Sequence, residues 1–161
     1  MAVNANNILI GAATVTLNGV DVGYTRGGTS VRYESESVDV DADQANGIVR
    51  KGRAMERQYV TIRLLEVSLE QMRIAMMFPS ASLSGSTLTL GYNGSCWTDE
   101  ITVVLVGPGP NCGTRTFSFT KGVSLGTREY TMARDNPVEY EVELEILKDT
   151  SGNFGTVTDS A

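Results

Sequence analysis

The sequence contains no histidine, and this absence removes whole classes of chemistry. Histidine is the commonest metal ligand and the usual general base near neutral pH. Without it the chain cannot hold a Ser-His-Asp triad or a Cys-His nucleophile pair. Carboxylates, lysine and tyrosine remain available, but the sequence argues against a hydrolase. We therefore expect a protein that is not an enzyme and that binds no cofactor or metal.

Cysteine is scarce as well, since Cys96 and Cys112 are the only two. They have neither the CxxC spacing nor the partner ligands of a zinc site. Two interpretations stay open for them. Synthesis in a reducing cytosol favours two reduced small residues, whereas an exported particle would allow a disulfide to form late.

Long apolar runs are missing too. No stretch reaches the roughly 18 consecutive apolar residues that a membrane-spanning helix needs. The N-terminal residues Met1–Ile8 lack the basic region of a secretory signal. We expect synthesis in a cytosol, where the protein stays unless other machinery exports it, and no insertion into a membrane.

Basic residues are outnumbered: 13 Lys and Arg stand against 19 Asp and Glu, a formal net charge of -6. Affinity for nucleic-acid phosphates comes from Lys and Arg, which release counterions on binding. An acidic chain is a poor DNA-binding regulator. The length of 161 residues suits a single domain.

Apolar and polar residues alternate along much of the chain, the pattern of half-buried strands. Asn18-Gly19 predicts a hairpin turn between Thr14–Leu17 and Val20–Val22. A long strand follows at Ser30–Asp41, and a change of apolar phase near Ser35–Ser37 indicates a bulge, a twist or a change of partner. The other predicted strands are Arg57–Glu66, Thr87–Tyr92, Glu100–Val106, Arg115–Thr120, Glu129–Met132 and Val138–Leu147.

One helix is predicted, over residues 68–78. Ser68 is a suitable N-cap, and Pro79 ends the segment. The residues at helical spacing that we expect to face the core are Leu69, Met72, Ala75 and Met76.

Two segments carry too few apolar residues to predict a regular element. Residues 43–56 are polar with two glycines, and we expect a long loop there. Residues 149–161 are rich in Gly, Ser and Thr, and we expect a flexible tail after an ordered core at about 7–148. The predicted fold is mainly β: one antiparallel β-sandwich-like or barrel-like domain over residues 1–161, with one flanking α-helix.

Two segments imitate known motifs and fail on their residues. Asp39–Asp43 begins like a calcium loop, but Gln44 and Arg50 stand where such a loop needs Gly and a bidentate Glu. Gly107–Gly113 has the glycines of a phosphate-binding loop, but its prolines remove amide donors and no Lys-Ser/Thr follows. We interpret it as a turn.

The segment Val138–Ile146 has apolar residues at every even position and glutamate at the four odd positions 139, 141, 143 and 145. In a strand these glutamates lie on one face, neighbours about 6.5–7 Å apart. The row is either a solvated sheet face that aids solubility or a functional acidic surface, since exposed faces usually mix both signs. A paired-carboxylate glycosidase site is a weaker alternative, because no aromatic-rich sugar cleft is visible.

The order of these elements, from about Asn7 to Leu147, resembles the major tail tube proteins of long-tailed bacteriophages. The similar features include the hairpin Thr14–Val22, the segment Gly23–Gly28 and the long strand after it. They also include Leu64–Glu70, which leads into the helix, and the late strand Val138–Leu147. The same fold occurs in tube proteins of contractile injection systems, so the order of elements leaves the type of tail open.

The resemblance implies a structural virion protein in the tail, made in the host cytoplasm. It implies hexameric rings whose strands join into an inner β-barrel and which stack into a tube with an acidic lumen. DNA passes through that lumen without specific binding. Implied partners are further copies of the chain, a tape-measure protein, assembly chaperones, a tail terminator and baseplate or tip proteins.

Carried onto this chain, the resemblance makes the strands Ser30–Asp41, Arg57–Glu66 and Val138–Leu147 the candidate barrel strands. Arg57 and Arg63 depart from an acidic lumen, so either they are paired or their face points elsewhere. The candidate lumen-lining residues are Glu34, Glu36, Asp39, Asp41, Glu139, Glu141, Glu143 and Glu145. The candidate contacts between rings, in the expected loop, are Asp43, Ile48, Val49, Arg50, Lys51, Arg53 and Glu56.

The alternative of a different class is a soluble β-sandwich or barrel that binds a ligand or another protein. It accounts for the strands, but not for the long polar segment or the row of glutamates.

Overall fold

A computed structural model of the chain describes residues 11–45, 47–65, 68–91, 100–124, 128–132 and 134–160. The start of the expected ordered core at Asn7–Ile10, Cys96 and the ends of two predicted strands, Glu66 and Tyr92, lie outside these residues. In chain order the elements are β1 (Thr14–Leu17), β2 (Val20–Asp21), β3 (Ser30–Ala42), β4 (Gly47–Leu64), α1 (Leu69–Ala75), β5 (Leu83–Ser84), β6 (Thr87–Leu88), β7 (Ile101–Pro108), β8 (Thr114–Val123), β9 (Glu129–Thr131), β10 (Glu139–Ile146) and β11 (Gly155–Ser160), with short 3-10 turns at Ser80–Ser82 and Pro110–Cys112.

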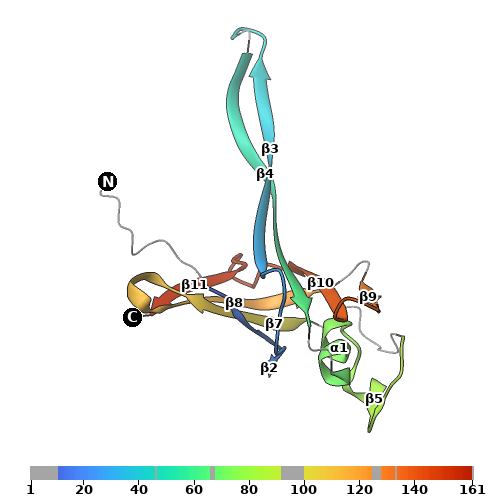
Figure 1. The fold of residues 1–161 in the computed structure, drawn as a ribbon. Coiled ribbons are helices and arrows are strands. Elements are labelled where there is room, and N and C mark those ends of the chain that lie inside the picture. The colour runs from blue at the N-terminus through green and yellow to red at the C-terminus, as the bar shows by residue number, and fades with distance from the viewer. Residues whose placement is uncertain are drawn as a thin grey trace.

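The mainly β, antiparallel fold with one helix is confirmed, and its main strands form a single sheet (Figure 1). The order in the sheet is β2-β1-β7-β8-β10-β4-β3, with β9 paired to β10 and β11 paired to β8. β5 and β6 form a separate two-stranded sheet beside α1. Sequence neighbours β3–β4 and β7–β8 pair as hairpins, whereas β10 returns late in the chain to lie between β8 and β4.

The hydrophobic core gathers side chains from five strands and the helix into one cluster. Strand alternation supplies it, because every second residue of a half-buried strand points inward. In β10 the even positions are fully or almost fully buried, and so are the β4 residues that face the first three of them. The contributors from these two strands are Tyr140, Val142, Leu144, Ile146, Val60, Ile62 and Leu64.

The helix begins at its predicted N-cap. The Ser68 hydroxyl accepts a hydrogen bond from the Gln71 backbone N–H (3.2 Å), and the Gln71 side chain accepts one from the Ser68 N–H (2.8 Å). The helix ends at Ala75, earlier than Pro79 implied, because Met77 adopts a left-handed φ of 57° and its N–H and that of Phe78 cap the last turn. Of the described residues of α1, those buried are Gln71, Ile74 and Ala75.

Of the predicted core stripe of the helix, Ala75 is buried and Met76 is partly buried against the core, whereas the prediction is wrong for Leu69, which is 37% exposed, and Met72 is only partly buried. The capping hydrogen bonds turn Gln71 inward, where its amide also donates to the Asp21 carbonyl. The geometry of the N-cap, and not the spacing of apolar residues, determines which side of this short helix packs against the core.

The expected long loop at residues 43–56 is wrong. Residues 47–56 belong to β4, which pairs with β3 from Gly47 to Thr61, and residues 43–45 form a turn after Ala42. Two register shifts occur, between Glu36 and Ser37 and between Val40 and Asp41, each where β4 carries one extra residue. The predicted irregularity near Ser35–Ser37 is confirmed, but the inserted residue belongs to β4. The sequence did not predict this part of β4, because neither of its faces is buried and its residues therefore do not alternate between apolar and polar.

The flexible tail expected at 149–161 is also corrected. Residues 155–160 form β11, which pairs antiparallel with β8 from Gly155↔Phe119 to Ser160↔Thr114. The Arg115 guanidinium and the Asp159 carboxylate opposite it form a two-point ion pair at 2.6 and 2.8 Å. β10 pairs with β8 only at Gly122 and Val123, so the edge of β8 at residues 114–119 is open to β11. The side chains of β11 are all exposed, and its pairing with β8 is what orders it.

Candidate assembly interface

A hairpin projects far from the body of the molecule (Figure 1). We call its projecting part, from Glu34 in β3 to Arg57 in β4, the arm. β10 pairs with β4 only at Gln58–Leu64, so beyond that point the arm is a two-stranded ribbon. Every described residue of the arm except Ala42 and Glu56 is exposed. Both outer edges of the ribbon therefore present backbone donors and acceptors that no described strand pairs.

The arm exposes more apolar surface than a free ribbon favours. Its large apolar side chains are each about half exposed, from 44% to 54%, and they are Val38, Val40, Ile48, Val49 and Met55. An isolated two-stranded hairpin is marginally stable in water, and apolar side chains on it have no layer to pack against. The arm has the properties of a surface that another chain covers.

The row of glutamates in β10 lies on one face of the sheet, as the alternation predicted. The residues between the glutamates are buried, whereas Glu141 and Glu143 are exposed and Glu139 and Glu145 are half-buried. In the register, Glu141 lies opposite Arg63 of β4, and Glu34 of β3 lies opposite Arg57 of β4. The outward side of β10, β4 and β3 thus forms one continuous surface, which we call the charged face.

The charged face is not a row of unpaired carboxylates. Three arginines pair with it: Arg26 with Glu139 at 2.8 Å, Arg63 with Glu141 at 2.5 Å, and Arg32 with Glu143 at 3.6 Å. The Arg32 guanidinium also stacks over the Tyr59 ring, 4.7 Å from its centroid. These half-exposed pairs contribute little stability each, about 0–1 kcal/mol. They remove the like-charge repulsion that the sequence pattern implied.

The predicted acidic residues of β3 divide between two faces. Glu34 and Glu36 share the charged face with the β10 glutamates, because β3 alternates without interruption and Glu34 lies opposite Arg57 in the register of the two strands. Asp39 and Asp41 are at odd positions and so point to the other face of the ribbon, where Asp39 forms an ion pair with Lys51 at 3.2 Å. Of the predicted inter-ring residues, Asp43 lies in the turn and the rest lie on β4, from Ile48 to Glu56.

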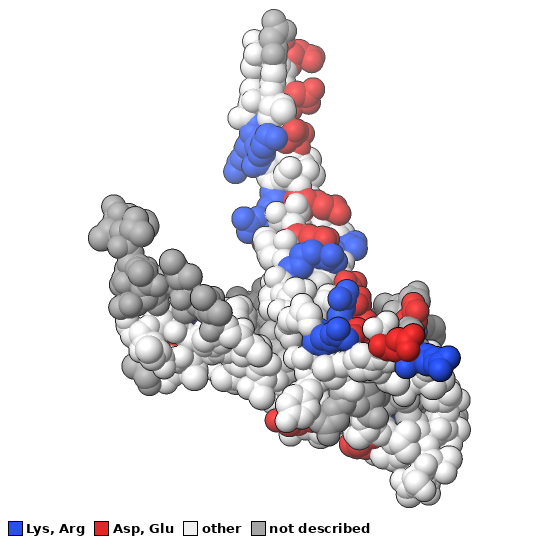
Figure 2. All heavy atoms as spheres, viewed as in Figure 1, with Lys and Arg blue, Asp and Glu red and all other residues white. Residues whose placement is uncertain are grey.

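Acidic and basic residues are segregated along the arm. From Glu34 to Ala42, β3 carries carboxylates and no basic residue, whereas β4 from Gly47 to Arg57 carries four basic residues and one acid. In the upper part of the arm, Figure 2 shows carboxylate side chains along one edge and basic side chains along the other. The acids of β3 are Glu34, Glu36, Asp39 and Asp41, and the bases of β4 are Arg50, Lys51, Arg53 and Arg57.

A polar cluster fixes the base of the arm to the body. The carboxylate of Glu56 accepts hydrogen bonds from Lys148 (2.6 Å), Arg53 (2.6 Å) and the Tyr33 hydroxyl (2.8 Å). These donors, Lys148 first, lower the pKa of Glu56 to about 2. The Lys148 ammonium lies over the Phe154 ring, and the Tyr33 ring meets Phe154 edge-on.

Sequence reasoning missed the residues that complete these contacts: Arg26, Arg32, Lys148 and Phe154. The partners are far apart in the chain, since Arg26 and Glu139 are separated by 113 residues and Lys148 and Glu56 by 92. A signal did exist for the tail, because Phe154 precedes the β-branched residues Thr156, Val157 and Thr158. That run is typical of a strand.

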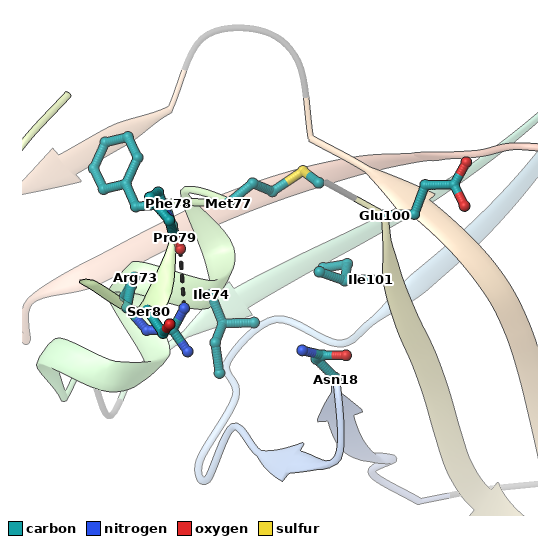
Figure 3. A pocket seen from close by; sticks show the side chains of 9 residues that line it. All are labelled: Asn18, Arg73, Ile74, Met77, Phe78, Pro79, Ser80, Glu100 and Ile101. Atoms are coloured by element: carbon teal, nitrogen blue, oxygen red, sulfur yellow. Dashed lines mark hydrogen bonds between the residues drawn. The ribbon is translucent and has the colours of Figure 1, made fainter. Parts of the chain in front are cut away.

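A hollow of about 570 Å³ lies between α1 and the turn after β1 (Figure 3). Its two charged side chains are already engaged. The Arg73 guanidinium binds the Glu70 carboxylate at 2.6 and 3.0 Å and donates to the Phe78 carbonyl, as the dashed line marks, and Glu100 pairs with Lys121. The hollow offers a ligand few free polar partners.

Within the described ranges, no group of three or more Cys, Asp or Glu is placed to hold a metal ion. The same part of the chain contains no helix with the length and apolar character to cross a membrane.

Comparison with known proteins gives a likeness in structure only. No model of a protein family matches the sequence, and no curated protein matches it. A chain in the virion of the native gene transfer agent (GTA) particle superposes with a TM-score of 0.50 at 11% identity, covering 99% of this chain and 100% of that one. A chain in the tail of an empty GTA particle, refined with C6 symmetry, gives a TM-score of 0.49 at 13% identity, with the same coverage. The chain shares its fold, over its whole length, with a chain of the GTA virion.

Proposed function

We propose that this chain is the structural subunit of the tail tube of a phage or phage-like particle. In this proposal six copies form a ring, rings stack into a hollow tube, and DNA leaves the particle through it. The fold shared with a chain of the GTA virion supports a place in such a particle. The number of copies and the passage of DNA follow from the sequence resemblance to tail tube proteins.

The observation that carries the proposal is the arm. A projecting ribbon with two unpaired edges and half-exposed apolar side chains is a liability for a monomer, because such edges recruit other strands. In a closed ring each edge meets an edge of the next copy, and no edge remains. The cost of exposing the arm is then removed by assembly.

The charged face is the proposed wall of the lumen. It holds more carboxylates than guanidinium groups, and three of its arginines, Arg26, Arg63 and Arg32, are already engaged by glutamates. Phosphates that approach it find few free cationic partners, so DNA passes without being held. The proposed lining residues are Glu34, Glu36, Glu139, Glu141, Glu143 and Glu145, while Asp39 and Asp41 point to the other side.

The end of the arm is the proposed contact between stacked rings. Its turn carries Asp43, and Ile48 and Val49 follow on β4 with more than half of their surface exposed. Apolar side chains at the end of a projecting element are suited to anchor on a neighbouring ring. By the same resemblance, the tube is built around a tape-measure protein and is closed by terminator and baseplate or tip proteins.

Electron microscopy of the purified chain tests the proposal. We expect rings or tubes with six-fold averages, either at high protein concentration or after addition of the particle's own tail-initiation proteins. A structure of the native particle that places this chain outside the tail would overturn the proposal. So would a chain that stays monomeric under both conditions.

A further inference from the structure

We infer that neighbouring copies join arm to arm in one direction only, the acidic β3 edge of one copy against the basic β4 edge of the next. The inference rests on the proposed function, and it adds which two edges meet and what selects them. Each copy would use both edges, one toward each neighbour, which is a head-to-tail interface.

The first support is that both edges are open and chemically different. β3 pairs with β4 on one side, and no described strand pairs with its other side. β4 is likewise open from Gly47 to Arg57, before β10 begins to pair with it at Gln58. The single acid on the β4 side, Glu56, is already bound by Lys148, Arg53 and Tyr33, so the edge presents positive charge.

The second support is that the charges of the arm are only partly paired within one copy. Asp39 pairs with Lys51, and Glu34 pairs with Arg32 below the arm. Asp41 and Arg50 have no ion pair among the described residues. Arg50 lies opposite Val40, and Asp41 lies opposite Ile48, so the register does not bring these two charges opposite each other. Each is left for a partner outside the chain.

The geometry of a hairpin makes the pairing antiparallel. β3 and β4 run in opposite directions, so β4 of one copy and β3 of a second copy in the same orientation also run in opposite directions. The charges are complementary on both faces of such a ribbon. One face carries Glu34, Glu36 and Arg57, and the other carries Asp39 and Lys51.

The same distribution disfavours the wrong assemblies. Two β3 edges would bring carboxylates against carboxylates, and two β4 edges would bring basic side chains together. Two-fold dimers through like edges are therefore opposed, and the head-to-tail contact that closes a ring is favoured. Because these charges are exposed, salt screens their attraction and weakens the contact; the Debye length is about 10 Å at 0.1 M salt.

Charge reversal tests the inference. One variant carries Asp39→Lys with Asp41→Lys, and a second carries Arg50→Glu with Lys51→Glu; all four side chains are exposed, so both variants should unfold at the wild-type temperature. At positions 39, 41, 50 and 51, toward the end of the arm, each variant alone carries charges of one sign on both edges. We expect its threshold concentration for assembly to rise at least about tenfold over wild type, the factor that corresponds to about 1.4 kcal/mol.

An equimolar mixture of the two variants should assemble again, because positions 39 and 41, basic in one variant, then meet positions 50 and 51, acidic in the other. A variant with all four substitutions should assemble alone but stay out of wild-type rings. Wild-type-like assembly of each single-edge variant, or failure of the mixture, would overturn the inference and leave the proposed function standing. A wild-type chain that forms no ring or tube under any condition would instead overturn the proposed function.

Discussion

At the scale of single residues, the ion pairs orient the strands and contribute little to the free energy of unfolding. Glu56 is the clearest case, since one carboxylate joins β4 to Lys148 after β10 and to Tyr33 of β3. Its side chain is 21% exposed, and its partners are more exposed still, so solvent weakens each pair. The cluster instead fixes the direction in which the arm leaves the body.

The low pKa of Glu56 predicts a pH dependence of stability. The folded pKa is about 2, below the ordinary value of 4.5, so the contribution is complete above about pH 4.5 and is lost as the pH falls toward 2. Glu56→Gln should flatten this part of the profile. The measurement is the urea midpoint of unfolding at pH 2–5 for the wild type and the variant.

Lys148→Met is the matched variant, because the Lys148 hydrogen bond is the largest cause of the low pKa. It should flatten the same limb in the same direction as Glu56→Gln. Parallel profiles for all three proteins would show that the cluster does not couple to folding.

At the scale of elements, the arm and the body are separable. No described arm residue is fully buried, and the core lies in β1, β4, β7, β8, β10 and α1. The arm contributes cross-strand pairs and little burial. The length of the arm therefore adds little to the stability of the body.

Shortening the arm should leave the body intact. Replacing residues 37–54 by Asn-Gly joins Glu36 to Met55, a directly opposed pair, through a favoured hairpin turn. The free energy of unfolding should change by less than about 1 kcal/mol, because loop length costs little and no buried residue is removed. Ring or tube formation should be lost, as seen by electron microscopy beside the full-length chain.

The control is a variant that keeps the arm and replaces another two-residue hairpin turn, Gly85-Ser86 between β5 and β6, by Asn-Gly. It should still assemble. Normal tubes from the arm-shortened chain would mean that the arm has no part in assembly.

At the scale of the whole molecule, the charged face is a balance of opposite charges with carboxylate in excess. The sequence alone suggested four crowded glutamates, whereas three of them meet an arginine within 3.6 Å. As the proposed wall of the lumen, this face would repel phosphates weakly and only at short range, since screening limits the reach of its charge to about 8 Å at physiological salt.

Reversing the charge of this wall should slow the passage of DNA. Glu141→Lys with Glu143→Lys adds two cations and frees the partners Arg63 and Arg32 to contact phosphate. Both glutamates are exposed, so the chain should fold and assemble as before. DNA ejection from particles that carry the variant should be slower than from wild type, and higher salt should reduce the difference.

Glu141→Gln with Glu143→Gln serves as the comparison, because it removes negative charge without adding a cation. It should slow ejection less than the lysine variant at equal salt. Equal ejection rates for all three particles would show that these side chains do not line the path of the DNA.

The features that the sequence determined by itself are those encoded by a few residues close together in the chain. Strict alternation from Val138 to Ile146 predicted both the strand and the shared face of its glutamates, because strand side chains alternate whatever packs on them. Asn18-Gly19 predicted the first hairpin, and Ser68 the start of the helix, because turn and cap geometry depend on only a few residues.

The tertiary structure alone decided the features that depend on a distant partner. Residues 47–55 and 155–160 are exposed and carry no inward-facing pattern, so hydrogen bonding to β3 and β8 makes them strands. The arginines that neutralise the glutamates come from other parts of the chain, up to 113 residues away. Local propensity cannot encode such contacts, because their free energy exists only once the sheet has brought the strands together.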